Sequence, residues 1–530
     1  MAAMSASTHV CNPDQVRRHD HLTDAAKLVA VPVFLAQLAF FTYVGLHRLV
    51  NGDEGFYLMA ARLISEHRKL YRDFFFLQMP LTPYVYALWM KLTHQSWISG
   101  RVLAALITTL LGTLIYAHVC RLTRSTMAGV AAALIYSSTA LIFSYFSLVA
   151  PHSLANLLIF SAYLLVSRVP SSSNTSLAFA GLLFGLSVDT RSYLVLVGPL
   201  FIWWICHCSA RPLWLRSSVS FAAGFLVAML LPLYLFVLSP GGFLFGNLEY
   251  HSLRSGSGLV GMWQQKLFTV LQALIGGPPG NGIQASLLLV ISFAFIFSIE
   301  RDKYVPRFAL LMTVAIGLIS LLPTPVYPQY FVYCFPFLIV TTVCLLHDLC
   351  AEIQSASGRL LAAVGCVVLL GIYLIAPVSD FRHYLITGEG VPGLERARDK
   401  QDWRVQRILE VSRAIDGLTR PGDTVISLWP GYLFSTHTVP LPCLESDFSL
   451  PVAAKVSPEH RRLYHAFTAA ELDEEIANHR TQLVILGNEN RLMHEIAKPS
   501  VAATLQSNGY ELIQSIGDTE IYKYTAKDTP

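Results

Sequence analysis

Residues 51–62 read NGDEGFYLMAAR and come shortly after a long apolar segment, residues 27–47. The stretch sets two adjacent carboxylates, Asp53 and Glu54, just beyond the apolar residues. Because a carboxylate is costly in hydrocarbon, a pair at a membrane face is either a solvated helix cap or a working site. The features of the rest of the chain distinguish these two interpretations.

The composition places the chain among polytopic membrane proteins. Of 530 residues, 54% are hydrophobic and only 14% are charged, against about 25% charged in soluble proteins, and the mean hydropathy is +0.50. The net charge is only +4 and no basic run stands out, which argues against nucleic acid as a partner. The nine cysteines fall mostly in or beside apolar segments and suggest no disulfide framework. The polar residues 1–26 are expected to form a cytoplasmic tail.

Apolar segments predict the transmembrane helices. About 20 apolar residues cross a bilayer, and the chain offers about eleven such segments, with one long segment, 176–208, broken in the middle at Asp189-Thr190-Arg191. The predicted spans lie near 27–47, 101–120, 127–146, 152–167, 176–189, 192–208, 217–238, 283–299, 308–323, 329–347 and 359–378. The chain is therefore expected to be a polytopic α-helical membrane protein with a transmembrane domain at 27–378.

The distribution of basic residues predicts the orientation, since Lys and Arg prefer the cytoplasmic ends of short loops. If 176–208 is a hairpin, the basic residues at the ends of alternate spans all fall on one side of the membrane. These residues are Arg121, Arg124, Arg168, Arg211, Arg216, Arg301, Lys303, Arg307 and Arg359. The N-terminus is then cytoplasmic, and three regions lie outside: loop 48–100, loop 239–282 and residues 379–530. An amphipathic stretch at 56–70 is expected along the membrane surface, and loop 239–282 contains a second amphipathic segment, 262–275.

Residues 379–530 are long enough for one small domain. A helical pattern at 401–418 leads through the turn Pro421-Gly422-Asp423 to an apolar strand at 424–428, and a helix near 469–479 precedes a second strand at 482–486. A third strand is expected at 520–524. Alternating helices and strands predict an extracytoplasmic α/β domain, and no Gly-rich phosphate loop indicates a nucleotide.

The acidic pair suggests group-transfer chemistry. An Asp can deprotonate an acceptor hydroxyl, and nearby cations would stabilise a phosphate leaving group. Arg191 lies at the tip of the broken hairpin, on the predicted side of the acids, and Tyr327, Tyr330 and Tyr333 gather where a late span begins. Helix capping remains the alternative for the pair, and Asp189 could pair structurally with Arg191.

The first loop resembles a known family. The run from Asp53 to Arg62, followed by Leu70-Tyr71-Arg72-Asp73-Phe74-Phe75 and Pro80-Leu81-Thr82-Pro83-Tyr84, is similar to the first outer loop of the dolichyl-phosphate-mannose protein mannosyltransferase superfamily. The bacterial and archaeal branch, which includes the lipid A aminoarabinose transferases, has the GT-C fold. Gly185–Arg191 and Tyr330–Pro336 support the resemblance more weakly.

The resemblance implies an inverting glycosyltransferase of a bacterial inner membrane. Its donor would be a polyprenyl-phosphate sugar, and its acceptor would be a lipid, glycan or protein at the outer face. Asp53 matches the family's leading acidic residue, the general base or acceptor-orienting group, and Glu54 would assist by hydrogen bonding. Further candidates for binding the donor phosphate or the substrate are Arg191, Tyr330, Arg72, Gln78 and His251. With its neighbour Asp73, Arg72 would also order the loop.

One departure and two alternatives accompany this interpretation. The aminoarabinose transferases carry Lys-Pro-Pro-Leu where this chain has Gln78-Met79-Pro80-Leu81, and Gln brings no charge to a phosphate. No cofactor is implied with certainty; a divalent metal is compatible with the acidic pair, although two residues do not make a coordination shell. A transporter or lipid-linked sugar flippase would move sugar without covalent transfer, and a non-catalytic scaffold would not need Asp53.

Overall fold

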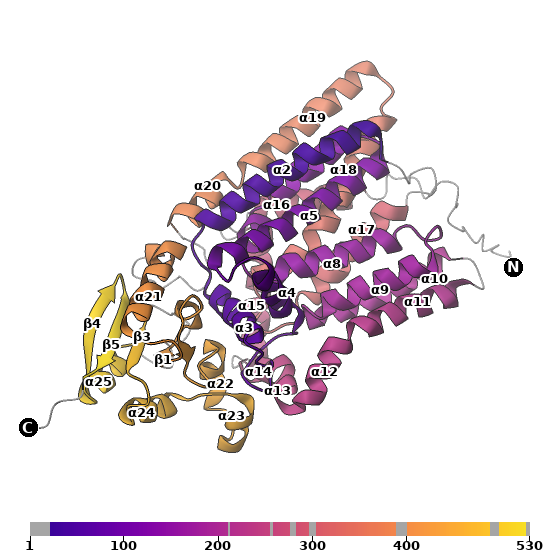
Figure 1. The fold of residues 1–530 in the computed structure, drawn as a ribbon. Coiled ribbons are helices and arrows are strands. Elements are labelled where there is room, and N and C mark those ends of the chain that lie inside the picture. Colours follow the sequence, from indigo (N-terminus) through magenta and orange to yellow (C-terminus); the bar gives the residue numbers. More distant parts are fainter. Residues whose placement is uncertain are drawn as a thin grey trace, which may run out of the picture.

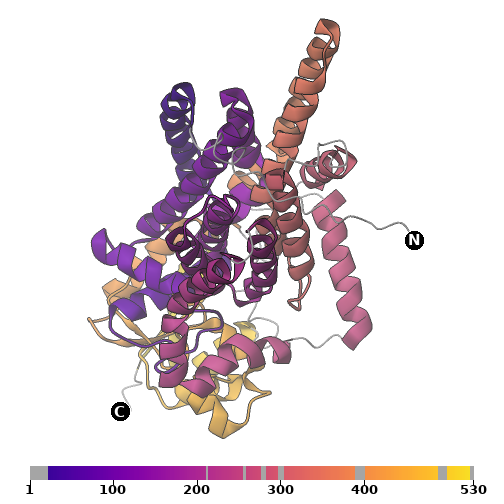
Figure 2. The same cartoon turned by 90° about the vertical axis from the view of Figure 1, so that its right-hand side faces the viewer.

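The computed structural model describes residues 22–209, 213–254, 258–275, 282–295, 304–387, 400–487 and 498–525. Most of the predicted N-terminal tail lies outside this range, as do Arg211, Arg301 and Lys303. The described chain is mostly helical, with one small sheet packed against an end of a helical bundle (Figure 1). In both views the sheet lies away from the tip where α18 passes to α19 (Figures 1 and 2).

Every predicted span coincides with helical structure within the described residues, and residues 296–299 of the span 283–299 lie outside them. The bundle contains α2 (Asp24–His47), α5 (Trp97–Thr123), α6 (Thr126–Ser138), α7 (Ala140–Phe146), α8 (Pro151–Val166), α9 (Asn174–Val188), η1 (Ser192–Val197), α10 (Gly198–Cys208), α11 (Leu213–Ala228), α12 (Leu230–Leu238), α16 (Gly282–Phe295), α17 (Tyr304–Ile319), η4 (Pro328–Cys334), α18 (Phe335–Glu352) and α19 (Ala356–Ile375). Among the described residues, four helices are long and apolar enough to cross a membrane, or up to six if each bent pair is one span. The count of eleven crossings stays a prediction.

Several of these helices are broken, and the breaks shape one end of the bundle. α6 and α7 meet at an angle of 63°, and α11 and α12 at 41°. The predicted break at Asp189-Thr190-Arg191 is present, because α9 ends at Val188 and η1 begins at Ser192. At each break, backbone groups and polar side chains can line a cavity. Irregular backbone at membrane depth is tolerated in such a place.

Shorter elements cover this end of the bundle. They are α3 (Gly52–Ser65), α4 (Leu81–Leu92), α13 (Pro240–Leu244), η2 (Phe245–Glu249), α14 (Tyr250–Arg254) and α15 (Gly258–Ile275). The stretch from Phe56 does not lie open on a surface as expected, since residues 56–63 are all buried. α15 fits its amphipathic pattern better, with Trp263 and Leu267 exposed and Gln265 donating to the Val326 carbonyl at 3.1 Å.

The C-terminal region forms the expected mixture of helices and strands. Its elements are α20 (Val378–Arg382), η5 (His383–Thr387), η6 (Lys400–Trp403), α21 (Val405–Leu418), β1 (Thr424–Ser427), η7 (Pro430–Tyr432), β2 (Val439–Pro440), η8 (Asp447–Ser449), α22 (Leu450–Ala453), α23 (Pro458–Tyr464), α24 (Ala469–Ala477), β3 (Leu483–Leu486), α25 (Lys498–Ser507), β4 (Tyr510–Ile516) and β5 (Thr519–Tyr524). The sheet order is β2-β1-β3-β5-β4. β1 pairs in parallel with β2 and β3, whereas β5 is antiparallel to β3 and β4.

The C-terminal region and the first loop share one hydrophobic core. Phe56 and Trp97 from the first part of the chain belong to the same buried cluster as Trp429, Phe434 and Phe448. The Phe56 and Phe448 rings form a T-shaped contact with 5.1 Å between their centroids. Burial of large aromatic side chains is a major source of packing free energy, so the two regions are joined by a continuous apolar contact.

Candidate functional site

The acidic pair begins α3, and the local sequence explains why. Asn51 is the N-cap, and its Oδ1 accepts a hydrogen bond from the Asp53 amide at 3.0 Å. The Glu54 carboxylate reaches back to accept from the Asn51 amide at 2.9 Å. This reciprocal pattern is a capping box, and acids in the first turn also suit the helix dipole. The capping alternative is therefore correct for Glu54.

Glu54 points into the protein rather than toward a site. Its Oε1 accepts from Arg101 Nη2 at 2.8 Å, and its Oε2 accepts from Arg101 Nε at 3.0 Å and from the Val149 amide at 3.2 Å. The Glu54 side chain is 0% exposed. Successive helical residues point about 100° apart, so Asp53 faces elsewhere.

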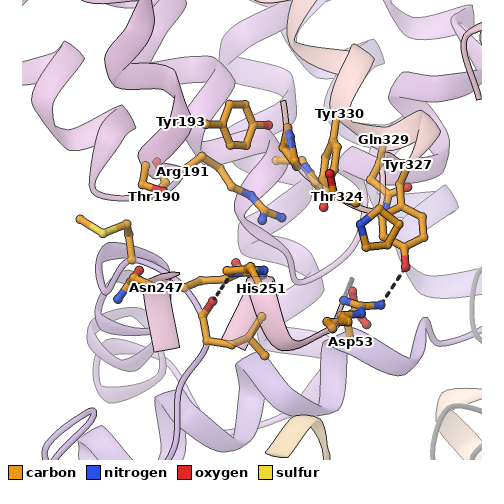
Figure 3. A pocket seen from close by; sticks show the side chains of 18 of the residues that line it. Asp53, Thr190, Arg191, Tyr193, Asn247, His251, Thr324, Tyr327, Gln329 and Tyr330 are labelled. Atoms are coloured by element: carbon orange, nitrogen blue, oxygen red, sulfur yellow. Dashed lines mark hydrogen bonds between the residues drawn. The ribbon is translucent and has the colours of Figure 1, made fainter. Parts of the chain in front are cut away.

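Asp53 lines a cavity at this end of the bundle. The cavity holds about 230 Å³ and collects side chains from segments far apart in the sequence (Figure 3). Its lining comprises Asp53, Leu77, Gln78, Met79, His152, Thr190, Arg191, Ser192, Tyr193, Asn247, His251, Arg254, Pro323, Thr324, Pro325, Tyr327, Gln329, Tyr330 and Phe448. Arg191 extends into the cavity from one wall, with Asp53 at the opposite wall and Tyr330 beside the gap (Figure 3).

Arg191 stands among phenol rings. Tyr57, Tyr193, Tyr330 and Tyr333 all interact electrostatically with its guanidinium. The expected pairing with Asp189 is not present, since neither carboxylate oxygen of Asp189 has a hydrogen-bond partner among the described residues. Phenols orient an arginine without neutralising it, so the guanidinium keeps its charge for an anionic ligand.

Other polar contacts fix the remaining walls. Tyr57 donates its hydroxyl to Gln78 Oε1 at 2.9 Å, and burial raises the pKa of Tyr57, which keeps this hydroxyl protonated. Arg254 Nη2 donates to the Tyr327 hydroxyl at 2.7 Å. These bonds hold the carboxamide of Gln78 and the mouth of the cavity in place.

Two histidines also line the cavity. His152 Nδ1 lies 3.0 Å from the Tyr333 hydroxyl. His251 Nε2 lies 3.2 Å from the Leu77 carbonyl, which requires Nε2 to carry the proton. The His251 ring is open to the cavity, but desolvation by the surrounding protein, with the charges of Arg254 and Arg191 nearby, lowers its pKa to about 4. A neutral imidazole is therefore present at neutral pH.

The structure thus gathers most of the candidate residues. Asp53, Gln78, Arg191, His251 and Tyr330 share one cavity. Glu54 and Arg72 do not line it. Arg72 is about half exposed and pairs with its neighbour Asp73, Nε to Oδ1 at 2.7 Å, consistent with the loop-ordering role.

Sequence reasoning missed several cavity residues. His152, Tyr193, Asn247 and Arg254 line the cavity but belong to no motif of the sequence. The one available signal was position, since His152 and Tyr193 follow breaks between predicted spans, and Asn247 and Arg254 lie in the predicted outer loop 239–282. Among the described residues, no group of three or more His, Cys, Asp or Glu side chains could hold a metal ion.

Comparison with solved structures establishes the fold. The apo structure of ArnT from Cupriavidus metallidurans is 13% identical, with a TM-score of 0.66, and the match covers 95% of this chain and 99% of that one. The structure of the same enzyme bound to undecaprenyl phosphate matches at 13% identity with a TM-score of 0.62, covering 94% and 98%. No curated protein matches the chain by sequence.

A family model also matches part of the chain. The model described as dolichyl-phosphate-mannose-protein mannosyltransferase matches residues 78–236. This segment begins after Asp53, overlaps the first-loop motif only at Pro80–Tyr84, and includes Arg191. The expected resemblance is therefore confirmed: over residues 78–236 the chain matches the dolichyl-phosphate-mannose-protein mannosyltransferase family, and over nearly its whole length it has the GT-C fold of ArnT.

Proposed function

We propose that this chain is a membrane glycosyltransferase that moves a sugar from a polyprenyl-phosphate donor to an acceptor hydroxyl or amine outside the membrane. The observation that carries the proposal is that one cavity brings together an acid, Asp53, and an arginine, Arg191. Group transfer from a phosphate ester needs a base for the incoming nucleophile and a cation for the leaving group. The two residues supply these roles.

The proposed reaction is a single displacement at the anomeric carbon. Asp53 accepts the proton of the acceptor as its oxygen or nitrogen attacks the carbon. The bond from the anomeric carbon to the phosphate oxygen breaks, and the electron pair stays on that oxygen. Arg191 holds the polyprenyl phosphate that leaves, with Tyr330 beside it. Attack opposite the leaving group inverts the anomeric configuration.

The size of the cavity supports a donor whose lipid stays outside. Sites for drug-sized ligands measure about 300–1,000 Å³, whereas this cavity holds about 230 Å³. A sugar phosphate head group matches that volume, and a polyprenyl chain does not. ArnT, whose fold this chain shares, has been solved with undecaprenyl phosphate bound, and the donor proposed here has the same lipid chemistry.

The proposal includes a topology. Residues 27–378 form the catalytic membrane domain, and 379–530 form an extracytoplasmic α/β domain. The N-terminus is cytoplasmic, and the membrane is the inner membrane of a bacterium. Glu54 takes a positioning role through Arg101, and Gln78 and His251 contact the substrate from the cavity wall.

A transfer assay tests the function. The full-length protein in lipid nanodiscs is incubated with undecaprenyl-phosphate-linked hexoses and pentoses carrying a radiolabel, together with envelope extract from cells that lack the protein. We expect one donor to lose its sugar to a covalent product, with release of undecaprenyl phosphate. Movement of labelled sugar across a vesicle membrane without a covalent product would refute the proposal and favour a transporter.

A further inference from the structure

A segment of the C-terminal region, residues 429–448, holds α3 along its whole length. Trp429 Nε1 donates to the carbonyl of Gly52 at 2.9 Å, at the first residue of the helix. In the last turn, Arg62 donates through Nη1 to the Leu433 carbonyl at 2.6 Å and through Nη2 to the Thr438 carbonyl at 2.7 Å. The helix that carries Asp53 is therefore fixed at both ends by residues that lie about 370 positions away.

The contact is tightest at Gly55. A Cβ atom added there would lie 2.8 Å from the Gly431 Cα and 2.8 Å from two atoms of the Trp429 ring. At Gly52, one turn earlier, an added Cβ would meet nothing within 4 Å. The helix thus approaches the 429–448 segment so closely that only glycine fits, two residues after Asp53.

Trp429 is itself held rigidly. Its ring is 1% exposed and meets Trp403 at 4.9 Å and Tyr432 at 4.8 Å between centroids. The Trp403 carbonyl in turn accepts from the Val50 amide at 2.7 Å, just before α3. The same segment also reaches the cavity, because Phe448 packs on Phe56 and lines it.

We propose that Trp429 is a positioning residue for Asp53: the bond from its indole N–H to the Gly52 carbonyl sets the first turn of α3 against the cavity. This inference rests on the proposed function of Asp53. Arg191 belongs to the turn between α9 and η1, and Tyr330 belongs to η4. Loss of the Trp429 contact should therefore disturb the base while leaving phosphate binding intact.

The chain offers a matched control for Trp429→Phe. Trp97 is also buried, at 0% exposed, and packs 5.9 Å from Trp429. Its indole nitrogen has no hydrogen-bond partner among the described residues. Both substitutions remove the same volume from the same cluster, but only Trp429→Phe removes a bond to α3.

The test uses the full-length protein in nanodiscs with three readouts: kcat for sugar transfer, binding of undecaprenyl phosphate alone, and amide hydrogen exchange in residues 51–57. We expect Trp429→Phe to lower kcat about 10- to 100-fold, as small misplacements of a catalytic group do, with faster exchange in 51–57 and unchanged lipid binding. Trp97→Phe should change kcat by less than about twofold. Equal losses in both variants would overturn the proposal.

A second pair of variants, Gly55→Ala and Gly52→Ala, distinguishes a loss of positioning from a folding defect. Gly55→Ala should lower kcat and speed exchange in 51–57, whereas Gly52→Ala, with open space at its Cβ, should do neither. Faster exchange without a loss of kcat would refute the positioning role but leave the role of Asp53 intact. Conversely, full activity of Asp53→Asn would refute the role of Asp53 as the base but not sugar transfer itself, while the exchange data would still report on the contact.

Discussion

Arg101 holds Glu54 in a buried pair, with Nη2 at 2.8 Å from Oε1 and Nε at 3.0 Å from Oε2. The two side chains are 1% and 0% exposed. Together with the backbone bonds to Glu54, this pair fixes the start of α3 and thereby the direction of Asp53. The adjacent acids thus have separate tasks, one in the architecture and one in the cavity.

Removing the charge of Glu54 should destabilise the protein. Glu54→Gln would leave Arg101 buried with a neutral partner, and breaking a buried pair costs about 3–5 kcal/mol. Thermal unfolding in detergent should show a large fall in Tm. The control is Glu66→Gln, which breaks the ion pair between Glu66 and Arg62. The Glu66 side chain is 45% exposed, so this substitution should cost less than about 1 kcal/mol. A Tm for Glu54→Gln as high as that of the control would contradict this role.

Arg191 should govern affinity for the lipid phosphate. Hydrogen bonds to charged groups contribute about 1.5–3 kcal/mol, so Arg191→Gln should weaken binding of undecaprenyl phosphate about 10-fold or more. Binding can be followed by microscale thermophoresis in nanodiscs. Arg72→Gln is the matched control, since Arg72 is exposed, pairs with Asp73 and does not line the cavity. Equal weakening in the two variants would show a general effect of positive charge.

His251 should make the protein sensitive to mild acid. Its folded pKa is about 4 because of burial and nearby arginines, against about 6.5 in an unfolded chain. Between these values the unfolded state binds more protons, so stability falls as pH drops from about 6.5 toward 4. As the pH drops from about 6.5 to about 4, the Tm of His251→Gln should fall less than the Tm of the parent protein. Identical pH slopes for the two proteins would contradict the assignment.

Local patterns predicted much of the fold. Apolar runs located the helices, and the polar triplet Asp189-Thr190-Arg191 located the break between α9 and η1. The alternation in 379–530 predicted β1, β3 and β5. The two-residue strand β2 and the largely exposed strand β4 lack the apolar pattern that marks a buried strand.

The unpredicted features depend on residues far apart in the chain. Arg101 is 47 positions from Glu54, and Trp429 is 377 positions from Gly52, so no local pattern joins them. The sequence suggested Asp189 as the partner of Arg191 because the two are close in the chain. In the structure its guanidinium interacts with tyrosines from α3, η1 and η4, which only the packing of the helices brings together.

The transfer rate of Asp53→Asn tests the central claim most directly. The substitution keeps the shape of the side chain and removes its ability to accept a proton. With the donor identified by the transfer assay, we predict that kcat falls about 10²- to 10⁴-fold, the usual contribution of a general base. Undecaprenyl phosphate binding and Tm should match those of the parent protein. A variant that transfers sugar at the parent rate would show that Asp53 is not the base.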